Sequence, residues 1–301
     1  MSQLHQIRRG EVTLVVEDHH PHVDDRPSVL LAHATGFCRQ VWQPVIDQLH
    51  GVCRVVTLDQ RGHGDSDKPL SGYRWEEFGA DLVAVVEALD LADLTAVGHS
   101  KGGAAVARLA GLRPERLRST ILLDPVLIPA MKDVAEGRSN FLAAGARRRR
   151  MVWSSRAEML EAWRQREPFS TWDGAALQAY VDGGSRVLPD GRVELKCPGE
   201  IEAQVYEGGG SSGSLDWLDA IPVPTLLVVG GSSLALPQAL AEHAATRLRD
   251  GRLLVLEGVG HFIPMERPAL VASLIREAVG AAPVSGQRVG PMGAERDGLG
   301  A

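Results

Sequence analysis

The chain has 301 residues, of which 44% are hydrophobic and 23% charged. This length and balance are typical of a globular protein with a substantial core, and they exclude a disordered scaffold, a collagen-like fibre and a disulfide-stapled miniprotein. The 32 Lys and Arg residues against 38 Asp and Glu residues give a net charge of −6. An acidic chain offers no electrostatic surface for a nucleic-acid backbone, so we expect no nucleic-acid partner.

The three cysteines, Cys38, Cys53 and Cys197, are an odd number without C-x-x-C spacing. This pattern favours neither a disulfide framework nor a zinc site. Residues 1–11 lack the apolar core of a secretion signal, and no apolar run approaches the roughly 18 residues of a membrane span. We therefore expect a protein of the reducing cytoplasm, without a membrane span.

Short apolar runs recur along the chain, and most are separated by stretches with helical spacing. The expected strands cover residues 12–17, 28–32, 52–58, 94–97, 120–123, 225–229 and 252–256. The clearest helix carries an apolar stripe from Phe78 to Leu89, which would lie against one face of a sheet. The alternation predicts an α/β fold with a mostly parallel central sheet and helices on both faces.

The alternation of apolar runs and helical stretches stops over residues 126–219, where the sequence becomes rich in Trp and Arg. Helical spacing recurs over 146–151, 156–166 and 174–181, and the segment is too long for a loop. A mostly helical insertion is expected, in which four tryptophans can cover apolar surface: Trp153, Trp163, Trp172 and Trp217. A lid over a pocket and an ordinary packed subdomain both fit this pattern.

This division predicts a core domain in two parts, residues 1–125 and 220–281, separated by the insertion over 126–219. The closing segment, 282–301, is rich in Gly, Pro, Ser and Arg and has almost nothing to bury, so we expect a disordered tail.

Two charged stretches suggest binding sites. The basic run 147–150 could favour an acidic substrate or partner, although a solvated helix face is the commoner explanation. Residues 18–25 hold three histidines and three aspartates, but they form a polar turn with Pro21 in its middle. Because nothing in such a turn fixes a coordination geometry, we expect no metal there, and no organic cofactor elsewhere.

Residues 97–103, Val-Gly-His-Ser-Lys-Gly-Gly, contain a G-x-S-x-G motif between a short apolar strand and an Ala-rich helical stretch. A serine at a sharp turn from strand to helix is held with its hydroxyl exposed. The crowded turn requires neighbours without side chains, and Gly98, Gly102 and Gly103 meet that requirement. Ser100 is therefore the candidate nucleophile.

A serine hydroxyl needs a neighbouring base to take its proton. His261 is the best of the ten histidines, because a Gly-rich loop after the expected strand 252–256 can bring its imidazole to the carboxyl edge of the sheet. His99 adjoins the nucleophile but should point elsewhere. His33 and His63 lie in turns, where a hydrogen-bonded structural role fits better.

The chain resembles a capped serine hydrolase of the α/β-hydrolase-fold superfamily, esterase-like or lipase-like, along nearly its whole length. Four stretches carry the resemblance: residues 30–37 (Leu-Leu-Ala-His-Ala-Thr-Gly-Phe), 58–66 (Leu-Asp-Gln-Arg-Gly-His-Gly-Asp-Ser), the turn around Ser100, and 260–262 (Gly-His-Phe). The resemblance implies the α/β-hydrolase fold with an inserted helical cap and a hydrolytic reaction, and it leaves the substrate open.

The sequence departs from the superfamily pattern at the acid that orients the histidine. The usual acid follows the strand that here covers 225–229, but residues 230–237 contain no carboxylate. Some members place the acid after the strand that follows the nucleophile, where Asp124 stands. Asp124 would give the chain order Ser, Asp, His of this fold. The alternative is that Asp124 only caps its strand and that no acid is present.

The second departure is Ala34, which stands where the superfamily more often has a glycine after the histidine. Counting from His33, the backbone N–H of Thr35 would bind the oxyanion of the tetrahedral intermediate, together with the N–H of Lys101. Because Ala34 can change the path of the loop, the N–H of Phe37 could serve instead. The Lys101 side chain could draw a substrate carboxylate inward, or pack its stem and leave its ammonium in solvent.

Together these features predict a hydrolase that cleaves a carboxylic ester or related acyl bond of a small apolar substrate through an acyl-enzyme. Ser100 would attack, His261 would transfer the proton and Asp124 would orient the histidine. Carbon–carbon bond hydrolysis, cofactor-free perhydrolysis and acyl transfer reuse these residues and stay open. The missing carboxylate after residue 229 favours a different class, a ligand-binding protein of this fold with slow or no turnover. The oligomeric state is open.

Overall fold

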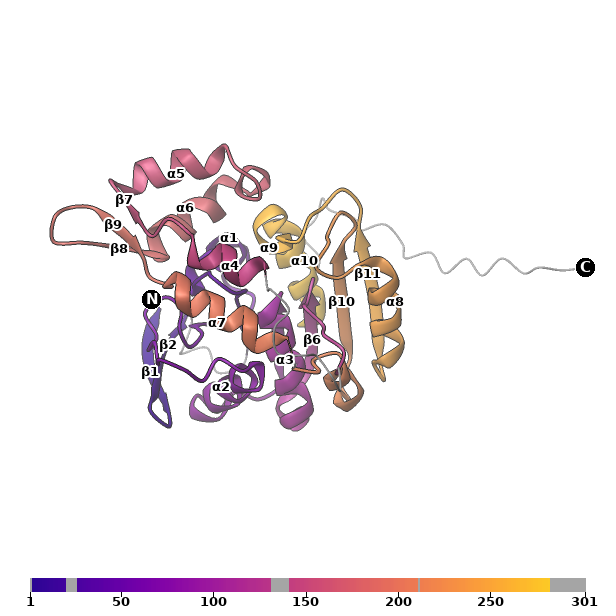
Figure 1. Cartoon of the computed structure of the whole chain (residues 1–301). Helices are drawn as coiled ribbons and strands as arrows, with labels where there is room; N and C mark the ends of the chain where they lie inside the picture. Colours follow the sequence, from indigo (N-terminus) through magenta and orange to yellow (C-terminus); the bar gives the residue numbers. More distant parts are fainter. Residues whose placement is uncertain (1, 20–25, 131–140, 211, 282–301) are drawn as a thin grey trace, which may run out of the picture.

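An eight-stranded sheet forms the centre of the computed structural model, which describes residues 2–19, 26–130, 141–210 and 212–281 (Figure 1). The strand order is β1-β2-β4-β3-β5-β6-β10-β11. The strands are β1 (Gln3–Arg9), β2 (Val12–Asp18), β3 (Ser28–Ala32), β4 (Arg54–Asp59), β5 (Leu94–His99), β6 (Leu117–Leu123), β10 (Thr225–Gly230) and β11 (Gly251–Leu256). Strand β2 is antiparallel to both of its neighbours, β1 and β4, and all other neighbouring pairs are parallel, which confirms the mostly parallel sheet.

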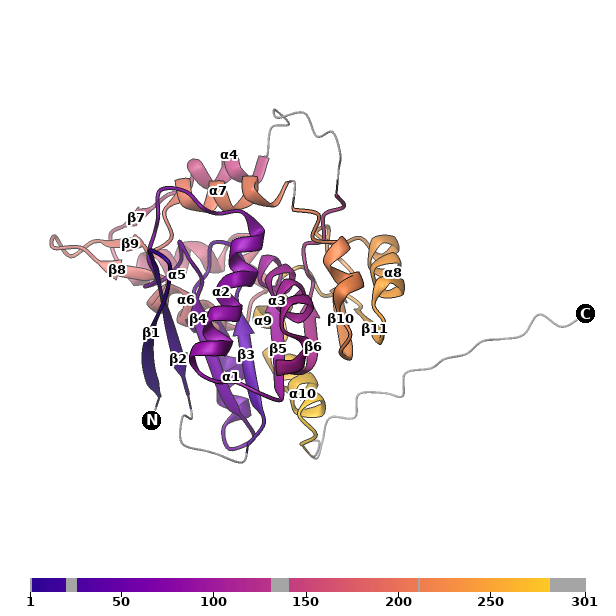
Figure 2. The same ribbon diagram turned by 90° about the horizontal axis from the view of Figure 1, so that it is seen from below.

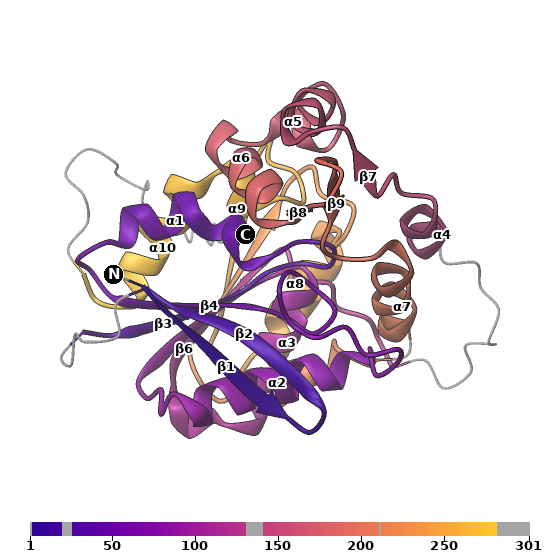
Figure 3. The same ribbon diagram turned by 90° about the vertical axis from the view of Figure 1, so that its left-hand side faces the viewer.

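Helices cover both faces of this sheet (Figure 3). On one face lie α2 (Trp75–Ala88), α3 (Lys101–Leu112) and α8 (Gln238–Arg247), and on the other α1 (Gln43–Leu49), α9 (Ile263–Glu266) and α10 (Pro268–Ala278). The expected stripe on α2 is buried at Phe78, Leu82, Val85 and Val86. Each face of the sheet is therefore covered by its own apolar cluster. The ends of the strands are left to carry functional residues.

Between β6 and β10 the chain leaves the sheet and forms what we call the insertion, residues 141–210. Its elements are α4 (Phe141–Arg147), β7 (Val152–Trp153), α5 (Arg156–Arg164), α6 (Gly174–Gly183), β8 (Ser185–Val187), β9 (Val193–Leu195) and α7 (Gly199–Gly209). The three strands form a small antiparallel sheet in the order β7-β9-β8. Helices α4 and α7 lie side by side beyond the carboxyl end of the large sheet (Figures 1 and 2).

The insertion differs from the expected mostly helical segment. The prediction of a helix over 146–151 is wrong, since α4 ends at Arg147 and Val152 pairs with Glu194 in the small sheet. Helix α7 was not predicted. Three of the four tryptophans are buried beside the α1 and α10 face, but Trp217 packs apart from them, against Arg108 of α3.

The expected tail, 282–301, lies outside the described residues, as do residues 20–25 of the His- and Asp-rich stretch. Asp18 accepts hydrogen bonds from Arg54, and Nε2 of His19 lies 3.2 Å from Oγ1 of Thr57. Within residues 2–19, 26–130, 141–210 and 212–281, no three His, Cys, Asp or Glu side chains form a group that could hold a metal ion. No helix in these ranges combines the length and apolar character that crossing a membrane requires.

Candidate active site

The direction of the chain connections reverses between two neighbouring strands, β3 and β5. The chain leaves β3 toward β4 on one side and leaves β5 toward β6 on the other. Such a switch point opens a crevice at the carboxyl ends of the strands, where open α/β sheets bind ligands. Ala32 pairs with Gly98 in register, so the loop with Thr35 and the turn with Ser100 meet there.

The turn at Ser100 is tight and strained. Ser100 has a φ of 57°, in a region that residues with a side chain rarely adopt, and it directly precedes α3. A Cβ on Gly98 would lie 2.3 Å from the carbonyl oxygen of Gly102, and a Cβ on Gly102 would lie 2.3 Å from that of Ala32. The absence of side chains at these positions therefore lets the strand, turn and helix approach so closely.

Ser100, His261 and Asp124 form one continuous hydrogen-bonded chain. Oγ of Ser100 lies 3.0 Å from Nε2 of His261, and Nδ1 of His261 lies 2.5 Å from Oδ2 of Asp124. Asp124 is fully buried, Ser100 is buried and His261 is part-exposed at the cavity. With Nδ1 donating to the carboxylate, Nε2 is the nitrogen that can accept the serine proton.

Asp124 is held by the loop that lacks the usual acid. Oγ of Ser233 donates to Oδ2 of Asp124 at 2.5 Å, and the N–H of Gly230 donates to Oδ1 at 3.2 Å. Asp124 itself has a φ of 42° just after β6, and its N–H donates to the carbonyl of Val228. Sequence reasoning missed Ser233. The signal that could have found it is a hydroxyl residue after β10, because β10 pairs with β6, the strand that precedes Asp124.

The other histidines near the site have hydrogen bonds that fix their tautomers. Nε2 of His99 donates to the carbonyl of His261 at 2.9 Å and so supports the loop that carries His261. Nδ1 of His33 donates to the carbonyl of Ala34, and Nε2 accepts from the N–H of Gln60. Burial lowers the pKa of His33 to about 3 and the pKa of His99 well below its ordinary value, so both stay neutral.

Two residues of the cavity have backbone N–H groups without an acceptor among the described residues. Thr35 and Lys101 both line the cavity, and within the described ranges their N–H groups make no hydrogen bond. The N–H of Phe37 instead donates to the carbonyl of Ala34 at 3.4 Å. Buried N–H groups are rarely left unpaired, so the first two fit an anion site, and Lys101 adds the positive end of α3.

Residues of the insertion hydrogen-bond to the loop that carries Thr35 and pack against it. The hydroxyl of Tyr180 donates to the carbonyl of Gly36 at 2.9 Å and accepts from Arg149 at 2.7 Å. Arg149 also pairs with Glu202 at 2.8 Å, and a Cβ on Gly36 would lie 2.7 Å from the Glu202 carboxylate. We call Arg149, Tyr180 and Glu202 the loop clamp. It ties α6 and α7 of the insertion to the candidate oxyanion site.

A cavity of about 1320 Å³ opens at Ser100 and His261 between the sheet and the insertion. One wall is aromatic: the ring of Trp163 stacks on Phe169 and on Tyr180, and Phe37 packs edge-on against Tyr180 and Phe262. Exposed apolar side chains stand at its rim, namely Phe141, Leu142 and Leu234. Such a cavity suits a substrate with an apolar body.

Known proteins resemble this chain in sequence and in fold. The family model described as "alpha/beta hydrolase fold" matches residues 27–268. The chain belongs to the α/β-hydrolase fold family. The match covers six of the eight strands of the large sheet, β3 to β6, β10 and β11, with the turn at Ser100 and the loop at His261, so the fold expected from the sequence is confirmed.

Individual relatives of this α/β hydrolase are distant but cover most of its length. A 2-(acetamidomethylene)succinate hydrolase of Mesorhizobium japonicum is 26% identical over 90% of this chain and 93% of its own. A pimeloyl-[acyl-carrier protein] methyl ester esterase of Neisseria meningitidis is 29% identical over 83% of this chain and 76% of its own. The crystal structure of E-2-(acetamidomethylene)succinate hydrolase superposes with a TM-score of 0.79 at 21% identity, covering 93% of this chain and all of that one.

The Lys101 side chain of this α/β hydrolase has neither of the roles considered from the sequence. It is buried, and its ammonium donates to Oε1 of Gln60 at 2.6 Å and lies 3.8 Å from the ring centre of Phe78. Burial lowers the pKa of the Lys101 ammonium well below its ordinary value. The ammonium therefore reaches neither the solvent nor a ligand in the cavity.

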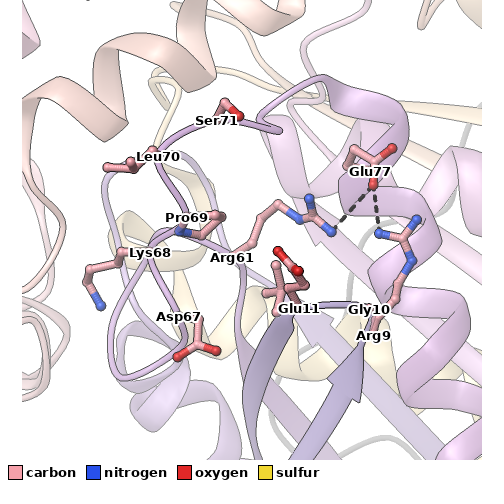
Figure 4. A pocket seen from close by; sticks show the side chains of 11 residues that line it. Arg9, Gly10, Glu11, Arg61, Asp67, Lys68, Pro69, Leu70, Ser71 and Glu77 are labelled. Atoms are coloured by element: carbon pink, nitrogen blue, oxygen red, sulfur yellow. Dashed lines mark hydrogen bonds and ion pairs between the residues drawn. The ribbon is translucent and has the colours of Figure 1, made fainter.

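A second hollow, of about 910 Å³, lies between the β1–β2 turn and the start of α2 (Figure 4). Arg9 and Arg61 both point at Glu77 there, and both also pair with Asp81. The two guanidinium groups are thus neutralised within the fold, and none of the candidate catalytic residues lines this hollow.

Proposed function

We propose that this protein is a serine hydrolase that cleaves an ester or related acyl bond through an acyl-enzyme, with Ser100 as nucleophile, His261 as base and Asp124 as the orienting acid. The observation that carries the proposal is the unbroken chain from Oγ of Ser100 to Nε2 of His261 at 3.0 Å and from Nδ1 to Asp124 at 2.5 Å. The relatives named above are a hydrolase and a methyl ester esterase, which supports the same reaction class.

The reaction follows from the geometry. Nε2 of His261 takes the Ser100 proton as Oγ attacks the carbonyl carbon, and the negative oxygen is bound by the N–H groups of Thr35 and Lys101. The intermediate collapses when His261 returns that proton to the leaving alcohol, which leaves an acyl ester on Ser100. Water, deprotonated by His261, then attacks the acyl carbon, and the acid product and Ser100 are released. Every proton passes through His261, so these steps need no cofactor.

The insertion acts in this proposal as a cap over the substrate. Helices α4 and α7 lie beyond the strand ends that carry Ser100 and His261, and the insertion supplies the aromatic wall of the cavity. We propose a core of residues 1–125 and 220–281 with a cap over 126–219. A cytoplasmic location is supported by the three cysteines, which are buried free thiols.

The proposal is tested with p-nitrophenyl esters of graded acyl length on the wild-type protein and on Ser100→Ala. We expect hydrolysis with a burst of p-nitrophenol equal to the enzyme concentration when deacylation is slow, and a loss of at least about 10³-fold in kcat for the variant. Equal rates for Ser100→Ala would overturn the nucleophile. Specific binding of the esters without turnover would favour the ligand-binding protein.

Turnover by other chemistries on the same residues is separated by product analysis. A C–C bond substrate would release two carbon fragments, hydrogen peroxide would yield a peracid, and an added alcohol would yield a new ester. The acyl-enzyme proposal predicts that hydrolysis is the fastest of these reactions with simple esters.

A further inference from the structure

The cavity at Ser100 carries an excess of positive side chains. Four arginines line it, Arg148, Arg149, Arg150 and Arg166, against two carboxylates, Glu167 and Glu202. Whether such an excess is available to a ligand depends on which guanidinium groups are already neutralised by the protein.

Two of these arginines are neutralised. Arg149 donates to Glu202 and to Tyr180 within the loop clamp. Arg150 pairs with Glu158 and lies 3.9 Å above the ring of Trp153. Arg147, next in the run but outside the cavity lining, is held by both Glu200 and Glu207 of α7. These three arginines are paired with other residues of the insertion and help to hold it together.

Arg148 and Arg166 differ from their neighbours. Both are exposed at the cavity, and within residues 2–19, 26–130, 141–210 and 212–281 neither guanidinium group makes a hydrogen bond, ion pair or ring contact. They come from different parts of the insertion, just after α4 and just after α5. Arg148 and Arg166 therefore line the same cavity as Ser100, and among the described residues their guanidinium groups have no partner.

An unpaired arginine on an open surface needs no explanation, but this pair lines a cavity whose other walls are largely apolar. The guanidinium fork matches carboxylate and phosphate oxygens with two parallel hydrogen bonds. Charge-assisted bonds at the edge of an apolar cavity are screened less by water than those on an open surface. The acyl chain would lie along the aromatic wall, with its far end at these arginines.

We propose that the substrate of this hydrolase carries an anionic oxygen group, a carboxylate or a phosphate, at the end remote from the scissile bond, and that Arg148 and Arg166 bind it. This inference rests on the proposed function for the position of the scissile bond. The anion site itself belongs to the cavity and can be measured without turnover.

Binding is measured first, on Ser100→Ala protein that cannot turn substrate over by the proposed route. Titration calorimetry uses linear dicarboxylates from succinate to suberate and alkyl phosphates of matching length. We expect one member of either series to bind, and Arg148→Gln and Arg166→Gln each to weaken it about tenfold or more. The better series identifies the anion, and either one supports the site.

The matched control is Arg164→Gln. Arg164 is exposed, lies two residues from Arg166 and does not line the cavity, so the substitution removes the same charge without touching the proposed site. It should leave the affinity unchanged. No binding by any member of either series, or equal weakening by all three variants, would overturn the inference.

Turnover separates this inference from the proposed function. Monomethyl esters of the dicarboxylates are compared with methyl esters of uncharged acids of equal length. We expect the anionic esters to have a kcat/KM at least about tenfold higher, and this ratio to collapse in Arg148→Gln and Arg166→Gln. Equal turnover of both ester series would overturn the anion site and leave the hydrolase. Arginine-dependent binding without any ester turnover would support the anion site and contradict the hydrolase.

Discussion

Asp124 reaches His261 because β6 and β10 are neighbours in the sheet. Leu123 pairs with Val228 in register, so the carboxyl ends of both strands open toward the histidine loop. A carboxylate after either strand can therefore meet the same imidazole nitrogen. The acid has only to accept a hydrogen bond and stabilise the imidazolium, and this requires a position in space rather than a particular strand.

Asp124→Asn tests this assignment by replacing one carboxylate oxygen with an amide nitrogen. The amide removes the negative charge and can present an N–H to Nδ1, which favours the wrong histidine tautomer, so we expect kcat to fall by up to about 10⁴-fold. Steady-state kinetics with a p-nitrophenyl ester at pH 7 measures the change, and circular dichroism checks the fold. Turnover at the wild-type rate would show that Asp124 only caps its strand.

In the proposed mechanism Ser233 positions the acid, because its hydroxyl donates to Asp124 and touches no reacting atom. Ser233→Ala should lower kcat about tenfold with little change in KM.

The control for Ser233 is its neighbour. Ser232→Ala should leave kcat unchanged, while Ser233→Thr, which keeps the hydroxyl, should restore most of the activity. If Ser233→Ala left kcat unchanged, the bond to Asp124 would have no part in catalysis.

At the scale of elements, the loop clamp joins the insertion to the loop after β3. The carbonyl of Gly36 accepts from Tyr180, and Gly36 follows Thr35 directly, so the direction of the Thr35 N–H depends on α6. An oxyanion donor works only when it is held where the charge develops. In the proposed mechanism the insertion therefore also holds the loop that carries Thr35.

Tyr180→Phe tests this coupling. It leaves the Gly36 carbonyl without its donor, so we expect kcat to fall about tenfold, KM to change little, and the free energy of unfolding to fall by about 1–2 kcal/mol. Tyr206→Phe is the matched control, since its hydroxyl lies 3.5 Å from Glu202 and does not hold the loop. Equal kinetic effects of the two substitutions would contradict the clamp.

The elements that the sequence predicted and those that it did not differ in burial. The buried strands read as apolar runs, and all seven expected strands occur, with ends that lie within three residues of the expected ones. Strand β1 went unpredicted because it is an edge strand in which only Ile7 is buried, so its sequence carries no alternation. Helix α7 follows a proline and ends at Gly208 and Gly209, and the strands of the small sheet are too short for a periodicity.

At the scale of the whole molecule, several buried histidines make stability depend on pH. Burial lowers the pKa of His33 to about 3 and the pKa of His63 and His99 well below 6.5, so the folded protein holds them neutral. Below about pH 6.5 the unfolded chain takes up protons there that the folded chain does not. Stability is therefore complete above that pH and falls as the pH drops, by up to about 1.4 kcal/mol per pH unit for each histidine.

Urea unfolding at pH 7 and pH 5 checks this dependence. Carboxylates with a lowered pKa, such as Asp65 and Glu77, lose their contribution only below their unfolded values near 4, so they change stability little between pH 7 and pH 5. We expect a clearly lower free energy of unfolding at pH 5. Equal stability at both values would mean that these histidines are protonated in the folded protein.

The candidate site was predictable where the chemistry lies in local motifs and not where it depends on pairing between distant segments. The turn at Ser100 and the loop at His261 each carry a local pattern. By contrast, Ser233 meets Asp124 across 109 residues, and the arginines of the run 147–150 are distinguished only by glutamates of α5 and α7. No spacing rule in one sequence shows which arginine remains unpaired.

The most direct test of the central claim is the intact mass of the protein after incubation with a fluorophosphonate probe, followed by peptide mapping. We expect one adduct per chain, on Ser100, that disappears in Ser100→Ala and forms much more slowly in His261→Asn. Folded protein that gains no adduct, or gains it on another residue, would contradict the assembled nucleophile on which the proposed function rests.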